Sequence, residues 1–251
     1  MSKKIWITGA SSGIGKALAI KFAKEGWQVA ASARRENLLN ELVKISPNIY
    51  SFPLNVVNLE NSKKIFKEII EKLGEINLCV FSTGIYDPKK EKEINIEQIQ
   101  NVFNVNFFGT LNCIKSVESY FKNKRNGHIS IVSSLAGYRG LPNSSGYGPS
   151  KASLNNLAES LFFDFKKYDV RVSLITPGFI KTPMTDKNTF KMPFLKTSDF
   201  AANKIYNGLI KRNSFEISFP AELSIIMKIL RILPNKIYLF LIKKFTKYQK
   251  R

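Results

Sequence analysis

Short apolar runs and longer amphipathic patterns alternate along most of this 251-residue chain. The runs are rich in β-branched and aromatic residues, and the segments between them repeat apolar residues at helical spacing. Such a rhythm predicts βαβ units, whose right-handed crossovers place helices on both faces of a parallel sheet. Strands are predicted near 3–8, 27–33, 49–54, 77–82, 128–133, 170–175 and 214–219. Helices are predicted near 14–25, 36–44, 60–73, 95–122, 146–168 and 198–211, with two helices in the fourth segment.

The predicted fold class is α/β: a doubly wound, seven-stranded parallel sheet, or Rossmann fold, with a C-terminal helical extension. One domain of this length is common among α/β proteins, and no repeat or Pro/Gly-rich linker divides the chain. Apolar residues make up 44% and charged residues 23% of the sequence, as in soluble globular proteins. The segment 176–197, with three prolines, is expected to form one long functional loop.

A glycine-rich segment joins the first predicted strand to the first predicted helix. It runs from Thr8 to Gly15 and reads TGASSGIG. Glycines permit a tight turn and a close approach of the backbone to a pyrophosphate, and the N-terminus of the following helix offers free N–H groups and a positive dipole end. A glycine trio alone is weak evidence, but its place between strand and helix favours a dinucleotide-binding loop over an ordinary turn.

The end of the second predicted strand indicates which dinucleotide is preferred. An acidic residue there would hydrogen-bond the ribose 2′-hydroxyl of NAD, and none is present. Instead Arg34 and Arg35 follow the strand directly, and a guanidinium group suits a 2′-phosphate. A solvated surface pair is the alternative. The sequence favours NADP(H).

A tyrosine and a lysine stand four residues apart near the start of the predicted helix 146–168. This spacing puts Tyr147 and Lys151 on one helical face. Free tyrosine has a pKa of about 10 and is a poor acid–base group near neutrality, but an adjacent ammonium group favours the phenolate. Ser134, at the end of the preceding predicted strand, is placed to donate a hydrogen bond to a substrate carbonyl oxygen.

Three motifs, taken in order and spacing, resemble the short-chain dehydrogenase/reductase family. They are TGxxxGIG at 8–15, Ser134 with the Tyr147/Lys151 pair, and Pro177-Gly178 with Thr182 after the sixth predicted strand. The resemblance extends to about residue 220. We therefore expect a dinucleotide-binding catalytic domain over 1–220 and a basic, apolar helical extension of the same domain over 221–251. The resemblance also implies a homodimer or homotetramer.

The resemblance carries roles onto single residues. It implies a catalytic set of Asn106, Ser134, Tyr147 and Lys151, in which Asn106 orders a helix and a water of the proton relay. Lys151 would also bind the nicotinamide ribose, and Ile180 and Thr182 would contact the carboxamide end. The predicted cofactor-binding residues are Gly9, Ser11, Ser12, Ile14, Gly15, Arg34, Asn55, Val56, Gly84, Tyr147, Lys151, Pro177, Gly178, Ile180 and Thr182. No metal site is predicted.

Two positions depart from the usual family sequence. Where the family reads Asn-Asn-Ala-Gly after the fourth strand, this chain has Phe81-Ser82-Thr83-Gly84 and keeps only the glycine. Where an aspartate usually meets the adenine amino group, the chain has Asn55, whose amide oxygen also accepts a hydrogen bond. The first change alters the centre of the sheet and the adenosine contacts, whereas the catalytic residues are unchanged.

The leading hypothesis is reduction by NADPH of a ketone or aldehyde, or oxidation of the alcohol, on a hydrophobic substrate such as a lipid or acyl chain. A β-ketoacyl thioester reductase is the first alternative, because its acidic carrier protein would suit a basic surface. A non-catalytic NADP(H)-binding sensor or membrane-attached scaffold is the second. The intact set of Ser134, Tyr147 and Lys151 argues against that second alternative.

The tail from 223 to 251 combines basic and apolar residues. It holds eight basic residues and no acidic one, in a chain of formal net charge +20. Pro234 should split it into two short helices. The second helix is predicted to carry Lys236, Lys243, Lys244 and Lys247 beside an apolar face of Ile237, Tyr238, Leu239, Leu241, Ile242 and Phe245. This pattern favours contact with an anionic membrane surface, and packing against the core or a second subunit is the alternative.

Other features limit the cellular setting. A nucleic-acid partner is not predicted, because the tail is apolar between its charges. No stretch approaches the roughly 18 apolar residues that cross a bilayer, and the N-terminal apolar run is too short for a signal peptide. The expected location is the cytoplasm, with peripheral contact at the inner membrane surface. Cys79 and Cys113 are predicted to be buried thiols, and His128 is predicted to be structural.

Overall fold

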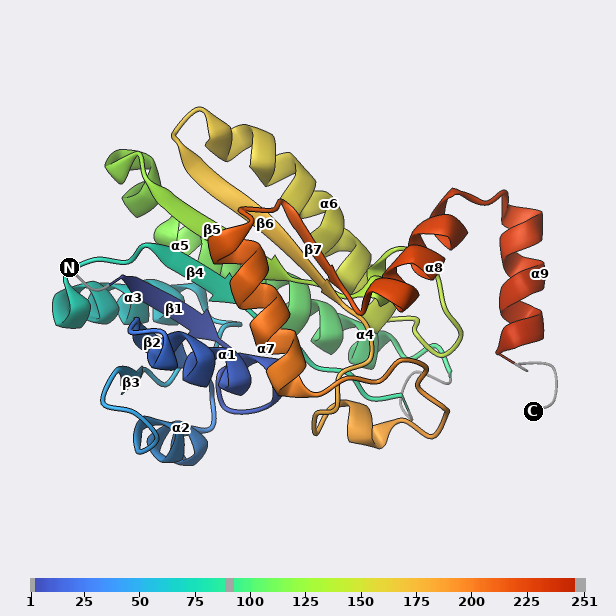
Figure 1. The fold of residues 1–251 in the computed structure, drawn as a ribbon, viewed down its shortest axis with the longest axis horizontal. Helices are drawn as coiled ribbons and strands as arrows, with labels where there is room; N and C mark the ends of the chain where they lie inside the picture. Colours follow the sequence, from blue (N-terminus) through green and yellow to red (C-terminus); the bar gives the residue numbers. More distant parts are fainter. Residues whose placement is uncertain (1–2, 89–92, 247–251) are drawn as a thin grey trace.

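The structure is a computed structural model that describes residues 3–88 and 93–246. Seven parallel strands form one sheet, as predicted, and their order is β3-β2-β1-β4-β5-β6-β7 (Figure 1). The strands are β1 Lys4–Thr8, β2 Gln28–Ser32, β3 Ile49–Ser51, β4 Leu78–Phe81, β5 Gly127–Val132, β6 Val170–Pro177 and β7 Glu216–Phe219. Their order reverses between β1 and β4, so the loops that follow these two strands diverge there. Doubly wound sheets bind ligands at such a point.

Helices cover both faces of this single domain. The helices of the first face are α1 Gly13–Lys24, α2 Glu36–Val43 and α7 Ser198–Tyr206. The helices of the second face are α3 Leu59–Leu73, α4 Ile96–Phe103, α5 Gly109–Lys124 and α6 Tyr147–Lys166. Successive side chains of β1 point to opposite faces of the sheet and therefore pack in different apolar clusters. Ile5 and Ile7 pack in the first apolar cluster, while Trp6 between them packs in the second.

The segment predicted as two helices near 95–122 is one uninterrupted helical path. α4 passes through a π-helical turn, η1 Asn104–Phe108, into α5, and the backbone stays in the right-handed helical region at both joints. A π turn accommodates an extra residue without ending the helix and is frequent at functional sites. Asn106 lies within this turn.

The chain ends in two helices beyond the last strand. β7 leads into α8 Ala221–Ile232, and α9 Asn235–Phe245 follows after Pro234, where the split was predicted. Leu233 is extended, as expected before a proline. The predicted apolar face of α9 included Tyr238. In the structure Tyr238 is buried, whereas Ile237, Leu239 and Phe245 of the same predicted face are exposed. Lys247 lies outside the described residues. Within 3–88 and 93–246, no helix is long and apolar enough to cross a membrane.

The cysteines and the histidine are structural, as predicted. Cys79 and Cys113 are buried free thiols, and burial raises the pKa of Cys113 to about 12. His128 is buried at the amino end of β5, where its Nε2 lies 2.9 Å from Ser173 Oγ. Burial, with a smaller effect of Arg171, lowers its pKa to about 3. The ring therefore stays neutral near pH 7, at the end of the strand away from Ser134.

Candidate active site

A cleft of about 650 Å³ opens at the carboxyl ends of the parallel strands. Of the predicted catalytic and cofactor-binding residues, all except Asn106 line it. They come from the loops after β1, β2, β3, β4, β5 and β6 and from the first turn of α6. The sheet thus brings together residues that are up to 173 positions apart, from Gly9 to Thr182.

The glycine loop leaves no room for side chains at three positions. A Cβ on Gly9 would lie 2.8 Å from Ser82 O, and one on Gly15 would lie 2.3 Å from Gly9 O. Gly13 has φ +55°, and a Cβ there would lie 2.9 Å from Thr182 Cγ2. The loop is therefore packed between the end of β4 and the segment after β6. Ser12, which precedes α1, makes no side-chain cap to the helix, so the positive end of α1 faces the cleft.

Two arginines stand at the end of the cleft beside β2. Both Arg34 and Arg35 are exposed and line the cleft. Arg35 donates from Nη2 to Ser11 Oγ and Ser12 Oγ, each at 2.8 Å. Both arginines were predicted to suit a 2′-phosphate, but only Arg34 was named as a cofactor-binding residue. The contact of Arg35 with serines 23 and 24 residues earlier cannot be seen in local spacing.

The described lining residues include no aspartate or glutamate. Their charged members are Arg34, Arg35, Lys151 and Lys187, so the cleft is strongly cationic. Low-dielectric walls lined by one sign of charge concentrate the field toward an oppositely charged ligand. The cleft is accordingly suited to an anion such as a dinucleotide pyrophosphate.

Asn106 lies behind the cleft wall and is fully buried. Its Oδ1 accepts a hydrogen bond from Ile85 N at 2.7 Å, and its Nδ2 donates to Ile85 O and to Ser150 Oγ, each at 3.1 Å. The amide thus joins the π turn to the loop after β4 and to the first turn of α6. A Cβ on Gly84 would lie 3.4 Å from Asn106 Oδ1 and 3.5 Å from Lys151 Nζ, which places both groups next to Gly84.

Tyr147 and Lys151 share one face at the start of α6. The Lys151 Nζ lies 5.7 Å from the centroid of the Tyr147 ring and donates to Val132 O at 3.0 Å. Lys151 is buried, and burial lowers its pKa to about 8. The ammonium group can therefore influence the phenol at short range, and it exchanges its proton much closer to neutrality than an exposed lysine does.

Ser134 lies two residues past the end of β5 and lines the same cleft. Its Oγ accepts a hydrogen bond from Ala136 N at 3.1 Å and lies 3.4 Å from Pro177 O, to which it donates. The first bond caps a short 3-10 turn, η2 Leu135–Gly137. The hydroxyl is thus held between β5 and β6, and its hydrogen can be redirected toward an acceptor in the cleft.

The sequence departure at 81–84 has a structural explanation. The Phe81 ring is fully buried, with its centroid 5.5 Å from that of Trp6 in an edge-to-face contact. Ser82 N donates to Thr8 Oγ1 at 3.2 Å, which joins the ends of β4 and β1. An aromatic contact and a threonine therefore connect the central strands, where the family usually has asparagines. Asn55 lines the cleft, and its Oδ1 accepts from Val57 N at 3.3 Å.

Tyr86 was missed by the sequence analysis. It lines the cleft, and its ring centroid lies 4.7 Å from that of Tyr147. Lys187 was also missed; it lines the cleft and forms a 3.6 Å ion pair with Asp87. Neither residue belongs to a motif. Only the position of Tyr86 two residues after Gly84, and that of Lys187 inside the predicted loop 176–197, could have drawn attention to them.

Comparison with known proteins identifies the class. The family profile described as short chain dehydrogenase matches residues 3–192. The chain therefore belongs to the short-chain dehydrogenase family, whose members are oxidoreductases that bind nicotinamide cofactors and act on small-molecule substrates. Family members usually form oligomers.

Individual relatives agree with this class. An uncharacterized oxidoreductase of Myxococcus xanthus is 31% identical over 236 residues, 92% of this chain and 93% of the relative. The 3-oxoacyl-[acyl-carrier-protein] reductase FabG of Thermotoga maritima is 35% identical over 185 residues, 72% of this chain and 75% of the relative. The solved structure of ElxO with NADP bound has a TM-score of 0.77 and 25% identity, covering 87% of this chain and 98% of that one.

Proposed function

We propose that this protein uses NADPH to reduce a ketone or aldehyde group on a hydrophobic small molecule, or oxidises the corresponding alcohol in reverse. The observation that carries the proposal is the placing of Ser134, Tyr147 and Lys151 in one cleft with the glycine loop and two arginines. A proton-transfer group and an anion-binding site within the same cleft are what nicotinamide chemistry requires.

The residues present fit the cofactor. The glycines let the loop pack tightly against the end of β4 and the segment after β6, and the loop and the first residues of α1 line the cleft where a pyrophosphate would lie. Arg34 would bind the 2′-phosphate from the exposed side, and Arg35 would support the loop through Ser11 and Ser12. A bound NADPH would supply the hydride for the carbonyl carbon.

The protein side of the reaction is proton transfer. The Tyr147 hydroxyl gives its proton to the carbonyl oxygen, so that hydride and proton together yield the alcohol. Ser134 Oγ donates a hydrogen bond to the same oxygen and stabilises the charge that develops there. Lys151, whose pKa is lowered to about 8 by burial, favours the phenolate after transfer and returns a proton to Tyr147. Asn106, beside Gly84 and Lys151, orders a water in this relay.

The walls near Tyr147 support a hydrophobic substrate. Ile85, Tyr86, Pro183 and Met184 line this part of the cleft. Tyr86 stacks near the Tyr147 ring and offers an aromatic surface to a substrate chain. Arg34 and Arg35 lie at the glycine-loop end of the cleft, and the ion pair of Lys187 with Asp87 offsets one further positive charge, so the substrate is expected to be apolar around its carbonyl group.

The catalytic claim is tested by comparing Tyr147→Phe with Tyr168→Phe. Both substitutions remove one phenolic oxygen, but Tyr168 lies just past the end of α6 and outside the cleft. With NADPH and a panel of aliphatic, aromatic and acyl ketones, Tyr147→Phe should lower kcat by about 10²- to 10⁴-fold and leave NADPH binding nearly unchanged. Tyr168→Phe should behave as wild type. Unchanged turnover in Tyr147→Phe would refute the assignment.

The cofactor assignment is tested at the two arginines. Arg34→Ala should weaken NADPH binding by about 10- to 100-fold, the worth of a charge-assisted contact, and leave NADH binding unchanged. Arg35→Ala should weaken both, because Arg35 holds the serines of the glycine loop. Arg212→Ala, which removes an exposed arginine elsewhere on the protein, is the matched control. Equal or tighter binding of NADH by wild type would contradict the preference for NADPH.

A β-ketoacyl thioester reductase is the second candidate, favoured by the FabG relative and the net charge of +20. Turnover of acetoacetyl thioesters well above that of simple ketones would identify it. A non-catalytic NADP(H) sensor would instead bind NADPH with no turnover on any member of the panel. We also propose a homodimer or homotetramer, to be measured by sedimentation velocity.

A further inference from the structure

The two C-terminal helices lie at one end of the molecule, past the edge strand β7, and α9 stands away from the sheet (Figure 1). Eight large apolar side chains of these two helices are exposed. The rest of the described chain together exposes only slightly more side chains of this kind. The eight are Ile225, Ile226, Ile229, Ile232, Ile237, Leu239, Phe240 and Phe245. We call this set the C-terminal apolar surface.

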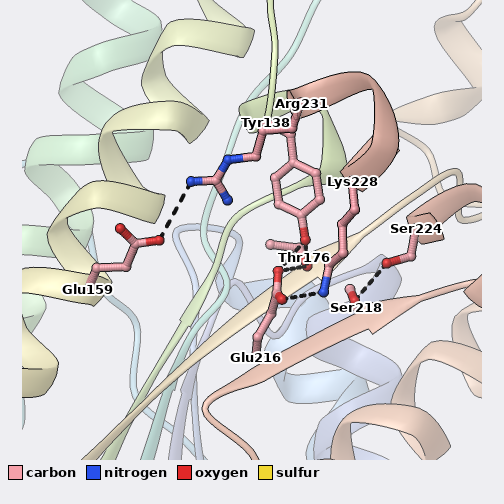
Figure 2. Close-up of polar contacts among 8 residues, drawn as sticks. All are labelled: Tyr138, Glu159, Thr176, Glu216, Ser218, Ser224, Lys228 and Arg231. Carbon is pink, nitrogen blue, oxygen red and sulfur yellow. Dashed lines mark hydrogen bonds and ion pairs between the residues drawn. The ribbon is translucent and has the colours of Figure 1, made fainter. Parts of the chain in front are cut away.

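The buried side of α8 is formed by Leu223, Ser224 and Met227, and the charged Lys228 and Arg231 lie at its margin. Figure 2 shows Ser224, Lys228 and Arg231 pointing from α8 toward the sheet and α6. Ser224 Oγ donates to Ser218 Oγ at 2.7 Å, Lys228 Nζ lies 2.5 Å from Glu216 Oε2, and Arg231 Nη2 lies 3.9 Å from Glu159 Oε1. Glu216 also accepts from the Tyr138 hydroxyl.

The isoleucines of α8 consequently face outward. Ile225, Ile226, Ile229 and Ile232 recur at one-turn spacing and are all exposed, with Ile232 81% exposed. A surface helix normally directs its charges to solvent and its apolar residues to the core. The outer side of α8 instead carries four isoleucines, because Leu223 and Met227 face the protein and the half-exposed ion pairs of Lys228 and Arg231 flank that buried side.

α9 extends the same surface and adds charge. It is anchored by Tyr238, whose hydroxyl donates to Gly140 O and whose ring lies 4.3 Å from the Arg139 guanidinium carbon. Lys236, Lys243 and Lys244 are exposed, and no ion pair within the described ranges includes them. The surface therefore combines exposed apolar side chains with unneutralised lysines.

We propose that the C-terminal apolar surface docks on an anionic lipid membrane. Apolar side chains interleaved with lysines match the boundary between acyl chains and anionic headgroups. A second copy of the chain fits less well, because a symmetric contact would bring the same lysines together, in a chain of net charge +20. Like charges facing each other across an interface oppose association.

Docking would bring a bilayer close to the substrate half of the cleft. Leu223, at the start of α8, packs in one apolar cluster with Leu135, Tyr138 and Met227, and a Cβ on Gly178 would lie 2.8 Å from Leu223 Cδ2. Gly178 lines the cleft. The membrane-facing helix is thus in contact with the wall of the site, which suits a substrate drawn from the lipid phase.

The test measures partition of the full chain onto vesicles by sedimentation, using phosphatidylcholine alone and phosphatidylcholine with phosphatidylglycerol. Ile229→Glu should reduce partition onto anionic vesicles by more than tenfold, because it removes an exposed isoleucine that would enter the membrane and adds a negative charge. Ile45→Glu is the matched control: Ile45 is 50% exposed and Ile229 52% exposed, and both changes alter the net charge equally. The control should partition like wild type.

A second pair of variants tests the charge contribution. Lys243→Ala with Lys244→Ala should lower partition by about 25-fold, or about fivefold for each lysine near an anionic surface. Lys64→Ala with Lys67→Ala, on the exposed side of α3, removes the same net charge elsewhere and should have little effect. Partition measured without substrate is independent of the proposed reaction.

Three outcomes would overturn the proposal. The first is equal partition of Ile229→Glu and Ile45→Glu. The second is binding to uncharged vesicles that is as strong as binding to anionic ones. The third is a loss of oligomer in Ile229→Glu, measured by sedimentation velocity without lipid, since the surface would then be an interface between copies of this chain.

Discussion

Replacing Lys151 by methionine should make the protein more stable while abolishing its activity. Lys151 is buried and its ammonium group has no acidic partner among the residues that line the cleft. Burial lowers its pKa from 10.5 to about 8. At about 1.36 kcal/mol for each pKa unit, the charged lysine costs the folded state roughly 3 kcal/mol at pH 7. Methionine has similar length and no charge to desolvate.

The lost hydrogen bond reduces this gain. Lys151 Nζ donates to Val132 O, and leaving that carbonyl without a partner costs roughly 1 kcal/mol. The variant should therefore be about 2 kcal/mol more stable than wild type at pH 7. For a chain of this size, each kcal/mol corresponds to about 2–4 °C in Tm.

The pH dependence has a definite sign. Below pH 8 both the folded and the unfolded wild type carry the Lys151 proton, so the penalty is fully present. Between about 8 and 10.5 the folded state has released the proton and the unfolded state still holds it. The contribution of Lys151 to the free energy of unfolding of the wild type therefore rises with pH across this range. The advantage of Lys151→Met should shrink across that range and be lost by about pH 10.5.

The assay is urea unfolding of both proteins without nucleotide, at pH 7 and at pH 10. Lys166→Met, on the exposed part of the same helix, should change stability by less than about 0.5 kcal/mol at either pH. A Lys151→Met variant that is less stable than wild type at pH 7, or whose advantage does not depend on pH, would refute the reasoning.

Two further variants probe the sheet centre and the base of α8. Phe81→Asn restores the usual family residue, yet it should lower the free energy of unfolding in urea by roughly 3–5 kcal/mol, because it removes a buried ring packed on Trp6. A decrease below about 1 kcal/mol would contradict this reasoning. Burial alone would raise the pKa of Glu216, but Lys228 and Tyr138 outweigh burial and lower it. Its stabilisation is thus present above its ordinary pKa and lost as pH falls. Glu216→Gln should cost about 1 kcal/mol at pH 7, after allowing for solvent screening, and progressively less as the pH falls toward and below the lowered pKa of Glu216. A cost that does not fall with pH would count against the ion pair.

Local spacing was sufficient for the features that depend on a few neighbouring residues. The TGASSGIG loop was recognised from its glycines standing between a predicted strand and a predicted helix. Tyr147 and Lys151 share a face because helical spacing dictates it. The split at Pro234 follows from the missing amide hydrogen of proline. These features are encoded by residues adjacent in sequence or one helical turn apart.

Contacts between distant loops could not be predicted in the same way. Arg35 reaches Ser11 and Ser12 only because β2 lies beside β1. Asn106 reaches Ile85 because a π turn rotates it toward the loop after β4, and a pattern of apolar residues does not distinguish a π turn from an α-helical one. Tyr86 joins the site through its packing on Tyr147.

The sequence alone determined the parallel αβ architecture and the order of the glycine loop, serine, tyrosine and lysine, because periodicity and spacing act within single elements. Only the tertiary structure decided which side of α8 faces solvent. Apolar residues lie on more than one side of this helix, so the pattern does not say which of them are buried. Leu223 and Met227 pack against Leu135 and Tyr138, and ion pairs to β7 and α6 flank them, which leaves the isoleucines outside.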